Sequence, residues 1–353
     1  MKFIINSRVM ILLIFSTLAS HQIKAAQNCN RQNIWDRPFN KIAQINVHNA
    51  TSTTKRGLVL NIKPCWNGWL PALCGYNTGI NPVADQNWDL QDQLNNGLRV
   101  FKLPIHPVGI DNTPWVTHTL QKREINDLVV SIAQKLPFSS STIQSAINSS
   151  LQKNLWNIDT SNTPFLNVLN QLKAFLDNNP HEIITLDLNT FDMNLMYAQF
   201  LNVFATSGID AYLFKPNTGN LSWPTFGQMI TSNQRLVVLC DTQMNQPGFI
   251  YSNQYTTANN YTYKSIDELN ADDCSIINKD PNTLFIMNHF ITGTLSGSTA
   301  LANQANTYQA LSNHIQKCCN STGRYPNLIP IDYVDVHFDD IKRVIDEVNS
   351  KKW

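Results

Sequence analysis

Short apolar runs rich in β-branched and aromatic residues recur along the chain, and longer polar or amphipathic stretches separate them. Two of the longer stretches show the helical spacing of apolar residues, at Pro164–Asn178 and Thr307–Lys317. The runs read as strands are Ile42–Val47, Leu98–Ile105, Trp115–Thr117, Glu182–Leu188, Arg235–Cys240, Thr283–Asn288 and Leu328–Tyr333. Strands that alternate with helices predict a parallel sheet covered by helices.

The number and spacing of these runs favour one kind of α/β fold. Six or seven strands in roughly 300 residues suit a closed or distorted barrel better than a doubly wound sheet. No glycine fingerprint follows any predicted strand, which argues against a nucleotide-binding fold. The chain also has no internal repeat and no low-complexity linker. The sequence therefore predicts an α/β protein with a distorted (β/α)8 TIM-type barrel in a single domain.

The N-terminal segment has the order of features typical of a secretory signal peptide. Positive charges precede an apolar run from Val9 to Ala19, and small residues follow at Ala25 and Ala26. The run of about 11 residues is too short to span a bilayer as a helix, which takes about 20. We expect residues 1–25 to be a signal peptide and residues 26–353 to form the barrel, so that the mature protein is secreted or otherwise extracytoplasmic.

The charge balance bears on partners. The formal net charge is +1 and only 14% of residues are charged. A protein with so little net charge has no broad electrostatic attraction to nucleic acid. We therefore expect no nucleic-acid partner.

The 7 cysteines all follow the predicted signal peptide. Disulfides are allowed in an exported protein. Cys65 and Cys74 flank a short loop and form the best predicted pair, and Cys274 is expected to pair with Cys318 or Cys319. The odd count leaves at least one thiol unpaired or paired between chains. No CxxC or HExxH spacing occurs, so no zinc site is expected.

Chemically capable side chains stand at the ends of several predicted strands. They are His48 and Asn49 on the first strand, His118 on the third, Asn189 on the fourth, Asp241 on the fifth, His289 on the sixth and Asp332 on the last. In a (β/α) barrel, catalytic groups cluster at the C-terminal ends of the strands. This end of the barrel is therefore predicted to hold the active site. The paired carboxylates Asp272 and Asp273 are expected to be solvated loop charges.

Four segments of the chain, taken in their order, match the motifs of a known family. They are IAQINVHNATS; DQLNNGLRVFKLPIH followed by WVTHTL; FLDNNPHEIITLDL; and TLFIMNHF together with RYPNLIPIDYV. Together they resemble the X-domain family of phosphatidylinositol-specific phospholipases C, from about residue 35 to residue 345. The resemblance is closest to the group that consists of the X domain alone, because no accessory lipid-binding domain is recognisable.

The resemblance implies acid–base chemistry by two histidines. His48 would be the base that deprotonates the inositol 2-hydroxyl, and His118 the acid that protonates the departing diacylglycerol oxygen. Asp332 matches the aspartate that orients the base. Imidazole suits both tasks because its pKa lies near neutrality. The implied partner is a phospholipid head group, met during transient contact with a membrane surface.

The sequence departs from the family at three positions that carry acidic residues in its calcium-dependent members. Lys102 and Pro104 occupy two of them on the second strand, and Asn189 occupies the third after the fourth strand. Asn49, beside the first histidine, does follow the calcium-dependent pattern. Calcium prefers several hard anionic oxygens. We therefore expect no cofactor and no tight calcium site.

Lys102 has two interpretations. It alternates with Val100 and Pro104 on one face of its strand. If that face points inward, its ammonium group would stabilise the negative charge that develops on the phosphate. Alternatively, it pairs with Asp187 or another barrel carboxylate. The predicted head-group contacts are Asn49, Arg99, Asp187 and Asn189, although Arg99 on its Gly-x-Arg turn also suits a structural anchor.

The leading prediction is an exported phosphodiesterase acting on phosphoinositides, glycosylated lipid anchors or a related diester. The alternative is a barrel without catalysis that binds lipid head groups or a partner protein, because three family carboxylates are missing. A glycerophosphodiester or sphingomyelin-type enzyme would need a metal-binding carboxylate set that the sequence does not assemble.

Overall fold

The computed structural model describes most of the chain from residue 34 to residue 351. The described residues are 34–57, 59–62, 76–77, 81, 83–109, 111–118, 158–216, 222–278, 280–292 and 297–351. The predicted signal peptide and the predicted Cys65–Cys74 disulfide lie outside them. Within these ranges, the helices are all too short or too polar to cross a membrane.

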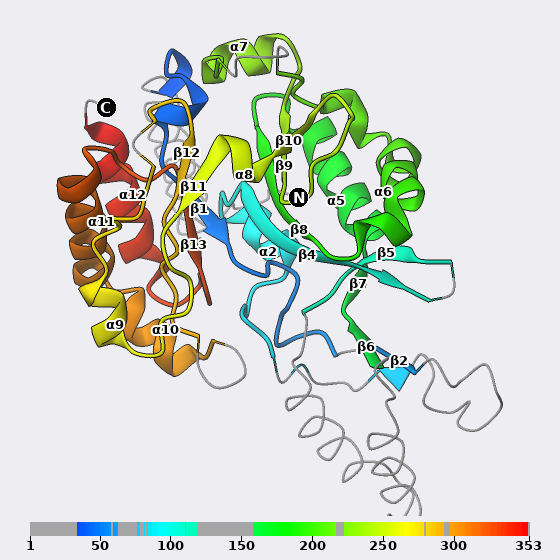
Figure 1. The fold of residues 1–353 in the computed structure, drawn as a ribbon, viewed down its shortest axis with the longest axis horizontal. Coiled ribbons are helices and arrows are strands. Elements are labelled where there is room, and N and C mark those ends of the chain that lie inside the picture. Colours follow the sequence, from blue (N-terminus) through cyan, green and yellow to red (C-terminus); the bar gives the residue numbers. More distant parts are fainter. Residues whose placement is uncertain are drawn as a thin grey trace, which may run out of the picture.

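A curled sheet of parallel strands forms the centre of the molecule (Figure 1). Its spatial order is β10 (Phe249–Tyr251), β9 (Leu236–Cys240), β8 (Ile184–Thr190), β4 (Val100–Val108), β1 (Gln44–Val47), β13 (Leu328–Ile331), β12 (Leu284–Ile286) and β11 (Thr256–Ala258). Each neighbouring pair on this path is parallel. Among the described residues no pairing joins β10 to β11, so the barrel is open there. The predicted distorted α/β barrel is confirmed.

Amphipathic helices cover the outside of the sheet. α5 (Phe165–Asn178) and α6 (Met193–Ser207) lie on the side of β8 and β9, whereas α11 (Tyr308–Thr322) and α12 (Phe338–Ser350) lie on the side of β13 (Figure 1). In α12 the buried residues are Ile341, Val344, Ile345 and Val348, the spacing of a single apolar stripe. The shorter elements are η1 (Phe39–Lys41), α2 (Leu90–Asn95), η4 (Ile209–Tyr212), α7 (Phe226–Thr231), α8 (Ser252–Tyr255), α9 (Ile266–Ala271) and α10 (Thr299–Ala305).

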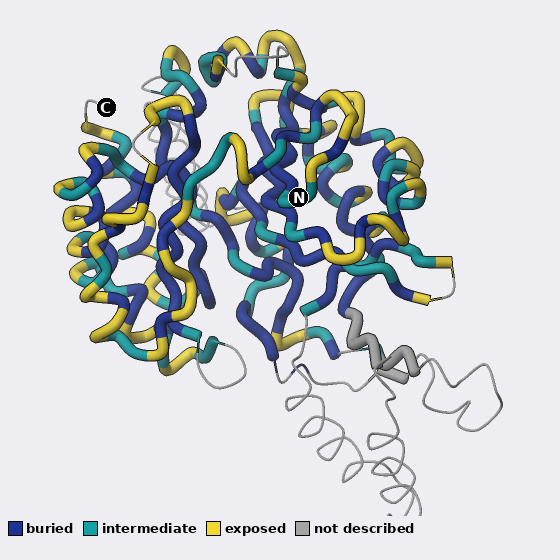
Figure 2. Tube along the Cα trace, in the orientation of Figure 1, coloured by how far each residue is buried: buried dark blue, intermediate teal, exposed yellow. Residues whose placement is uncertain are grey.

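The alternation of side chains along the strands produces two apolar cores. Phe101, Leu186 and Phe285 belong to the core between the sheet and the helices. Val100 and Leu284 belong to a second core inside the barrel. Figure 2 shows the buried strands and the exposed outer faces of the helices around them. Lys102 follows Val100 by two residues on the same strand face, so its side chain points into the barrel.

The predicted strand Trp115–Thr117 is not part of the parallel sheet. β5 (Thr113–Val116) pairs antiparallel with the end of β4, with Val116 opposite Ile105, and it continues the sheet to β7 (Thr163–Pro164). This hairpin directs the chain back over the barrel, and the backbone NH of Thr117 donates to the carbonyl of Pro104. His118 is thereby brought to the C-terminal end of the strands. A separate small sheet joins β3 (Tyr76–Asn77), β2 (Val59–Ile62) and β6 (Ile158–Ser161).

One predicted disulfide is present. Cys274 is bonded to Cys318, which settles the choice between Cys318 and Cys319. Cys319 has a free thiol, and so does the buried Cys240. Burial raises the pKa of the Cys240 thiol far above its ordinary value, and nearby Asp241 adds to the shift. Cys240 is therefore a packing residue of the outer core rather than a reactive thiol.

Candidate active site

The first histidine is held between two neighbouring strands. His48 directly follows β1, and Asp332 directly follows β13, the strand paired with β1. His48 Nδ1 lies 2.7 Å from Asp332 Oδ1. A carboxylate accepts hydrogen bonds, so Nδ1 is the donor, and Nε2 is left as the nitrogen that can take a proton from a substrate.

Several contacts fix the orientation of the His48 ring. The ring stacks on Phe290, with the centroids 4.0 Å apart and the planes 14° from parallel. The amide of Gln86 donates to the backbone carbonyls of His48 and Ile331, at 2.8 Å and 3.0 Å. Side chains restrained in this way provide the preorganisation that acid–base catalysis requires.

Asp85 connects the two histidines, and the sequence did not reveal it. Its side chain is 2% exposed. Oδ2 accepts a hydrogen bond from Asn49 Nδ2 at 2.7 Å and lies 3.5 Å from His118 Nε2. Asp85 precedes α2 and does not end a strand. A search for polar residues at the ends of predicted strands therefore does not find it. The structure thus brings His48, His118 and Asp332 into one cluster with Asp85 at its centre.

A glycine closes this cluster from the opposite side. The backbone NH of Gly297 donates to Asp85 Oδ1 at 3.1 Å. A Cβ atom at this position would collide with Asp332 Oδ2. A side chain at Gly297 would therefore displace the carboxylate that orients His48.

Burial dominates the electrostatics of the two histidines. It lowers the pKa of His48 to about 4; the charges of Asp85 and Asp187 oppose this shift, whereas the charge of Lys102 adds to it. Burial also lowers the pKa of His118, again opposed by Asp85, and a charge on His48 lowers it further. Both rings are therefore mainly neutral at pH 7. This state suits a base, and an acid reaches its charged form when an anionic phosphate binds beside it.

The two buried carboxyl groups shift in the opposite direction. Burial raises the pKa of Asp332 well above its usual range. Burial and the neighbouring Asp332 raise the pKa of Asp85, while His118, His48 and the hydrogen bond from Asn49 lower it. The hydrogen bond from His48 to Asp332 likewise favours the ionised form. The amide and imidazole donors are thus what allow two carboxyl groups to share this buried position.

Of the two interpretations of Lys102, the structure shows the pairing with Asp187. Lys102 lies opposite Asp187 in the register of β4 and β8, and its Nζ is 3.4 Å from Asp187 Oδ2. Asn46 Nδ2 also donates to Asp187 Oδ2, at 2.9 Å. The ammonium group points into the barrel near enough to His48 to lower the pKa of that ring. Lys102 therefore pairs with Asp187 and places its charge on the same side of the barrel as His48.

The remaining strand ends extend the polar lining of the barrel. Asn189 donates to Asp241 Oδ2 at 3.2 Å. The backbone NH and the hydroxyl of Thr190 both donate to Asp241 Oδ1, at 2.8 Å and 2.6 Å. Asn189 and Asp241 thus form a second polar group beside Lys102 and Asp187, in a place where a sugar hydroxyl could exchange hydrogen bonds.

The prediction that Arg99 contacts the substrate is wrong. Arg99 precedes β4 and lies at the opposite end of that strand from the His48 cluster. Its Nε is 2.9 Å from Glu182 Oε2, and its Nη1 donates to the carbonyls of Leu94 and Leu98, each at 2.8 Å. The guanidinium also lies over the ring of Phe175. Arg99 is the structural anchor that its Gly-x-Arg turn suggested.

The residues do not fit the calcium site of the calcium-dependent members. An ammonium group, that of Lys102, occupies one of the acidic positions, and Pro104 and Asn189 bring no charge to the others. Another set, His48, Asp85 and Asp332, has ligand atoms within 4.8 Å of one another. In that set His48 and Asp332 are hydrogen-bonded directly to each other, and Asp85 is held by Asn49 and Gly297. That no metal is needed stays a prediction, tested below.

Comparison with known proteins gives a consistent assignment. A family model described as PI-PLC X 1 matches residues 105–344, a range that includes His118 and Asp332. A PI-PLC X domain-containing protein of Arabidopsis thaliana is 24% identical over 306 residues, 84% of this chain and 58% of that protein. PI-PLC X domain-containing protein 1 of Arthroderma benhamiae is 23% identical over 247 residues, 64% of this chain and 79% of that protein. The chain thus spans little more than half of its plant relative.

A solved structure shares the fold. The phosphatidylinositol-specific phospholipase C from Listeria monocytogenes superposes with a TM-score of 0.54 at 15% sequence identity. The superposition covers 90% of this chain and 96% of that enzyme. The architecture is therefore that of the bacterial enzyme over nearly its whole length.

Proposed function

Because the chain belongs to the PI-PLC X domain family, we propose that it is a secreted phosphoric diester hydrolase or lyase of the phospholipase C type. It cleaves a phosphoinositide-like head group by acid–base catalysis with His48 and His118. The observation that carries the proposal is the shared cluster: His48 bonds Asp332 at 2.7 Å, and His118 lies 3.5 Å from Asp85, which also binds Asn49. Secretion rests on the N-terminal segment, residues 1–25.

The reaction follows from the roles of these groups. His48 Nε2 takes the proton of the head-group hydroxyl next to the phosphate, and the resulting oxygen nucleophile attacks phosphorus. The bond from phosphorus to the lipid oxygen breaks, and His118 donates a proton to that oxygen. The products are a cyclic phosphate and a diacylglycerol. Asp332 holds the base in the reactive tautomer, as the carboxylate of a catalytic triad does.

Lys102 supplies the positive charge of the site. As phosphorus becomes five-coordinate, negative charge accumulates on its non-bridging oxygens, and a fixed cation nearby stabilises that charge. Asp187 and Asn46 hold Lys102 in place from β8 and β1. In this proposal Lys102 replaces calcium, and Asn49, Asn189 and Asp187 contact the head group. Contact with a membrane surface is transient, as the substrate is a lipid.

The proposal is tested by incubating the purified protein with labelled phosphatidylinositol in mixed micelles, with EDTA or with added calcium. We expect a cyclic inositol phosphate to be released, at a rate that EDTA changes by less than about twofold, because no step needs a hard cation. Activity that disappears in EDTA and returns with calcium would contradict the metal-free mechanism.

A second function has its own motivation. The loss of three family carboxylates, at Lys102, Pro104 and Asn189, favours a catalytically impaired barrel that binds a lipid head group or a partner protein. Retention of phosphatidylinositol vesicles without release of any phosphate product would support this alternative.

The pKa shifts predict an acidic pH optimum. The base must be unprotonated, so kcat/KM falls as the pH drops through the pKa of His48, about 4. The acid must be protonated, so kcat/KM falls again as the pH rises above the pKa of His118, which lies below the ordinary 6.5. The expected profile is a bell with its maximum between these two values. Initial rates measured over a pH series in buffers of constant ionic strength check this. A kcat/KM that begins to fall only above pH 7 would contradict it.

A further inference from the structure

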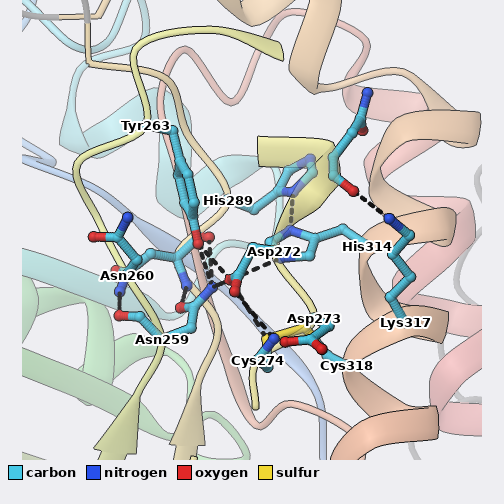
Figure 3. Close-up of polar contacts among 12 residues, drawn as sticks. Asn259, Asn260, Tyr263, Asp272, Asp273, Cys274, His289, His314, Lys317 and Cys318 are labelled. Atoms are coloured by element: carbon cyan, nitrogen blue, oxygen red, sulfur yellow. Dashed lines mark hydrogen bonds and ion pairs between the residues drawn. A yellow bond between two sulfur atoms is a disulfide. The ribbon is translucent and has the colours of Figure 1, made fainter. Parts of the chain in front are cut away.

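A second cluster of reactive side chains lies away from the catalytic site, around the Cys274–Cys318 disulfide (Figure 3). The disulfide links the loop after α9 to α11. His314, on α11, and Asp272, two residues before Cys274, stand next to it. The side-chain ligand atoms of Cys274, Cys318 and His314 all lie within 4.8 Å of one another. Both sulfurs and the imidazole are fully buried or nearly so.

A chain of two histidines fixes the tautomer of His314. His289 Nε2 is 2.9 Å from the carbonyl oxygen of Ala305, which can only accept, so His289 donates there. His289 Nδ1 then accepts from His314 Nδ1, which is 2.9 Å away. The other nitrogen of His314, Nε2, carries no proton in this tautomer and faces Asp272, 3.5 Å away. Metal-binding histidines are held in the same way, with the second ring nitrogen donating to a protein acceptor.

Asp272 provides a fourth donor that is already oriented. Its Oδ2 lies 3.5 Å from His314 Nε2 and 3.8 Å from Cys274 Sγ. The donor atoms around a tetrahedral zinc ion are separated by about 3.3 to 3.8 Å, given its bond lengths. Tyr263 OH and Asn259 Nδ2 both donate to Oδ2, and the backbone NH of Cys274 donates to Oδ1. Asp272 is therefore part of a built site, contrary to the prediction of a solvated loop charge.

We propose that reduction of the Cys274–Cys318 disulfide turns this cluster into a tetrahedral zinc site, with Cys274, Cys318, His314 and Asp272 as ligands. The separations of Asp272 from His314 and from Cys274 already suit a metal ion, whereas the two sulfurs must move apart and Cys318 must turn toward Asp272. Thiolate and imidazole donors select zinc over calcium or magnesium. Asp272, with 16% of its side chain exposed, marks the side from which the ion would enter.

The conversion balances as two steps. A dithiol gives two electrons and two protons to the disulfide: the S–S bond breaks, two thiols form, and the dithiol becomes a disulfide. The zinc ion then binds both sulfurs as thiolates, and their two protons leave to solvent. The loop after α9 thus stays joined to α11 in both states, through a covalent bond when oxidised and through the metal ion when reduced.

The experiment uses the full chain, reduced with dithiothreitol under nitrogen, freed of reductant and titrated with cobalt and then with zinc. Wild type is compared with three variants: Cys319→Ser as the matched control, His314→Gln, and the double variant Cys274→Ser/Cys318→Ser. Cobalt in a tetrahedral thiolate site gives intense visible and charge-transfer absorption. We expect these bands in reduced wild type and in Cys319→Ser, and their loss on addition of about one equivalent of zinc.

The other variants decide the outcome. His314→Gln retains the disulfide when oxidised, so it folds before reduction. After reduction it should bind cobalt and zinc at least about tenfold more weakly than wild type does. The double variant should give no bands. Identical bands in the double variant and in wild type, or none in reduced wild type, overturn the proposal.

Alkylation mapped by mass spectrometry gives a second readout that needs no variant. Zinc should slow the modification of Cys274 and Cys318 in the reduced chain and leave Cys319 unchanged. Equal modification of all three cysteines with and without zinc overturns the proposal as well. Neither readout depends on phosphodiesterase turnover.

Discussion

Replacing His48 with alanine is expected to lower kcat by about 10²- to 10⁴-fold, the usual range for a general base in acid–base catalysis. The reason is local. His48 Nε2 is the only group of the cluster that Asp332 holds in position to take the hydroxyl proton, through the 2.7 Å contact with Nδ1. Initial rates of cyclic phosphate release at pH 5 and pH 7 measure the effect.

Two controls separate loss of chemistry from loss of folding. His181→Ala removes an exposed imidazole at the other end of the barrel and should leave kcat unchanged. The truncation at His48 leaves a space beside Phe290 into which free imidazole can diffuse, so added imidazole should restore part of the activity of His48→Ala. Thermal unfolding of each variant reports on folding. Turnover in the folded His48→Ala variant within about fivefold of wild type would refute the role of the base.

Replacing Lys102 with methionine is expected to lower kcat by about 10²- to 10³-fold, with little change in KM. Losing one preorganised donor to a developing negative charge has an effect of this size. The Lys102 side chain is 19% exposed and lies near both Asp187 and His48. Among the described residues of the His48 cluster no other lysine or arginine could supply this charge. Steady-state kinetics on the same micelles give both constants.

The same substitution also removes the ion-pair partner of Asp187. A loss of stability from this cause must be separated from a loss of catalysis. Unpairing a buried carboxylate destabilises a protein by up to about 3 to 5 kcal/mol. The double variant Lys102→Met/Asp187→Asn removes both charges together and should recover stability. If Lys102 acts only by pairing with Asp187, the double variant recovers turnover too. If its charge stabilises the transition state, the double variant stays slower than Asp187→Asn alone. Wild-type turnover in a folded Lys102→Met would exclude catalysis by this residue.

Local pattern was sufficient to predict the class of fold. α5 begins and ends within one residue of its predicted bounds, because its apolar residues repeat with helical spacing over its whole length. Longer strands are recognisable from the sequence. In β8 apolar and polar residues alternate, and in β9 every residue is apolar. β10 and β11 were missed because each has three residues beside polar neighbours, whereas the three residues of β12 lie in a longer apolar run.

The same local rule predicted part of the candidate site. His48 follows one predicted strand and Asp332 lies near the end of another, and parallel strands end at one edge of a sheet. His118 reaches the same edge differently, because the antiparallel β5 turns back along β4. Lys102 was placed on a strand face by its alternation with Val100. The rule could not say whether that face points inward or what the ammonium group meets there.

What the sequence alone determined was therefore the alternation of strands and helices and the residue types at the strand ends, since both depend on neighbours a few positions apart. Tertiary structure decided the contacts: that His48 meets Asp332 across 284 positions, that Asp85 connects the histidines, that Arg99 stays at the far end, and that Cys274 pairs with Cys318 beside His314. Such contacts depend on the curl of the sheet and on the paths of its loops, which no short stretch of chain encodes.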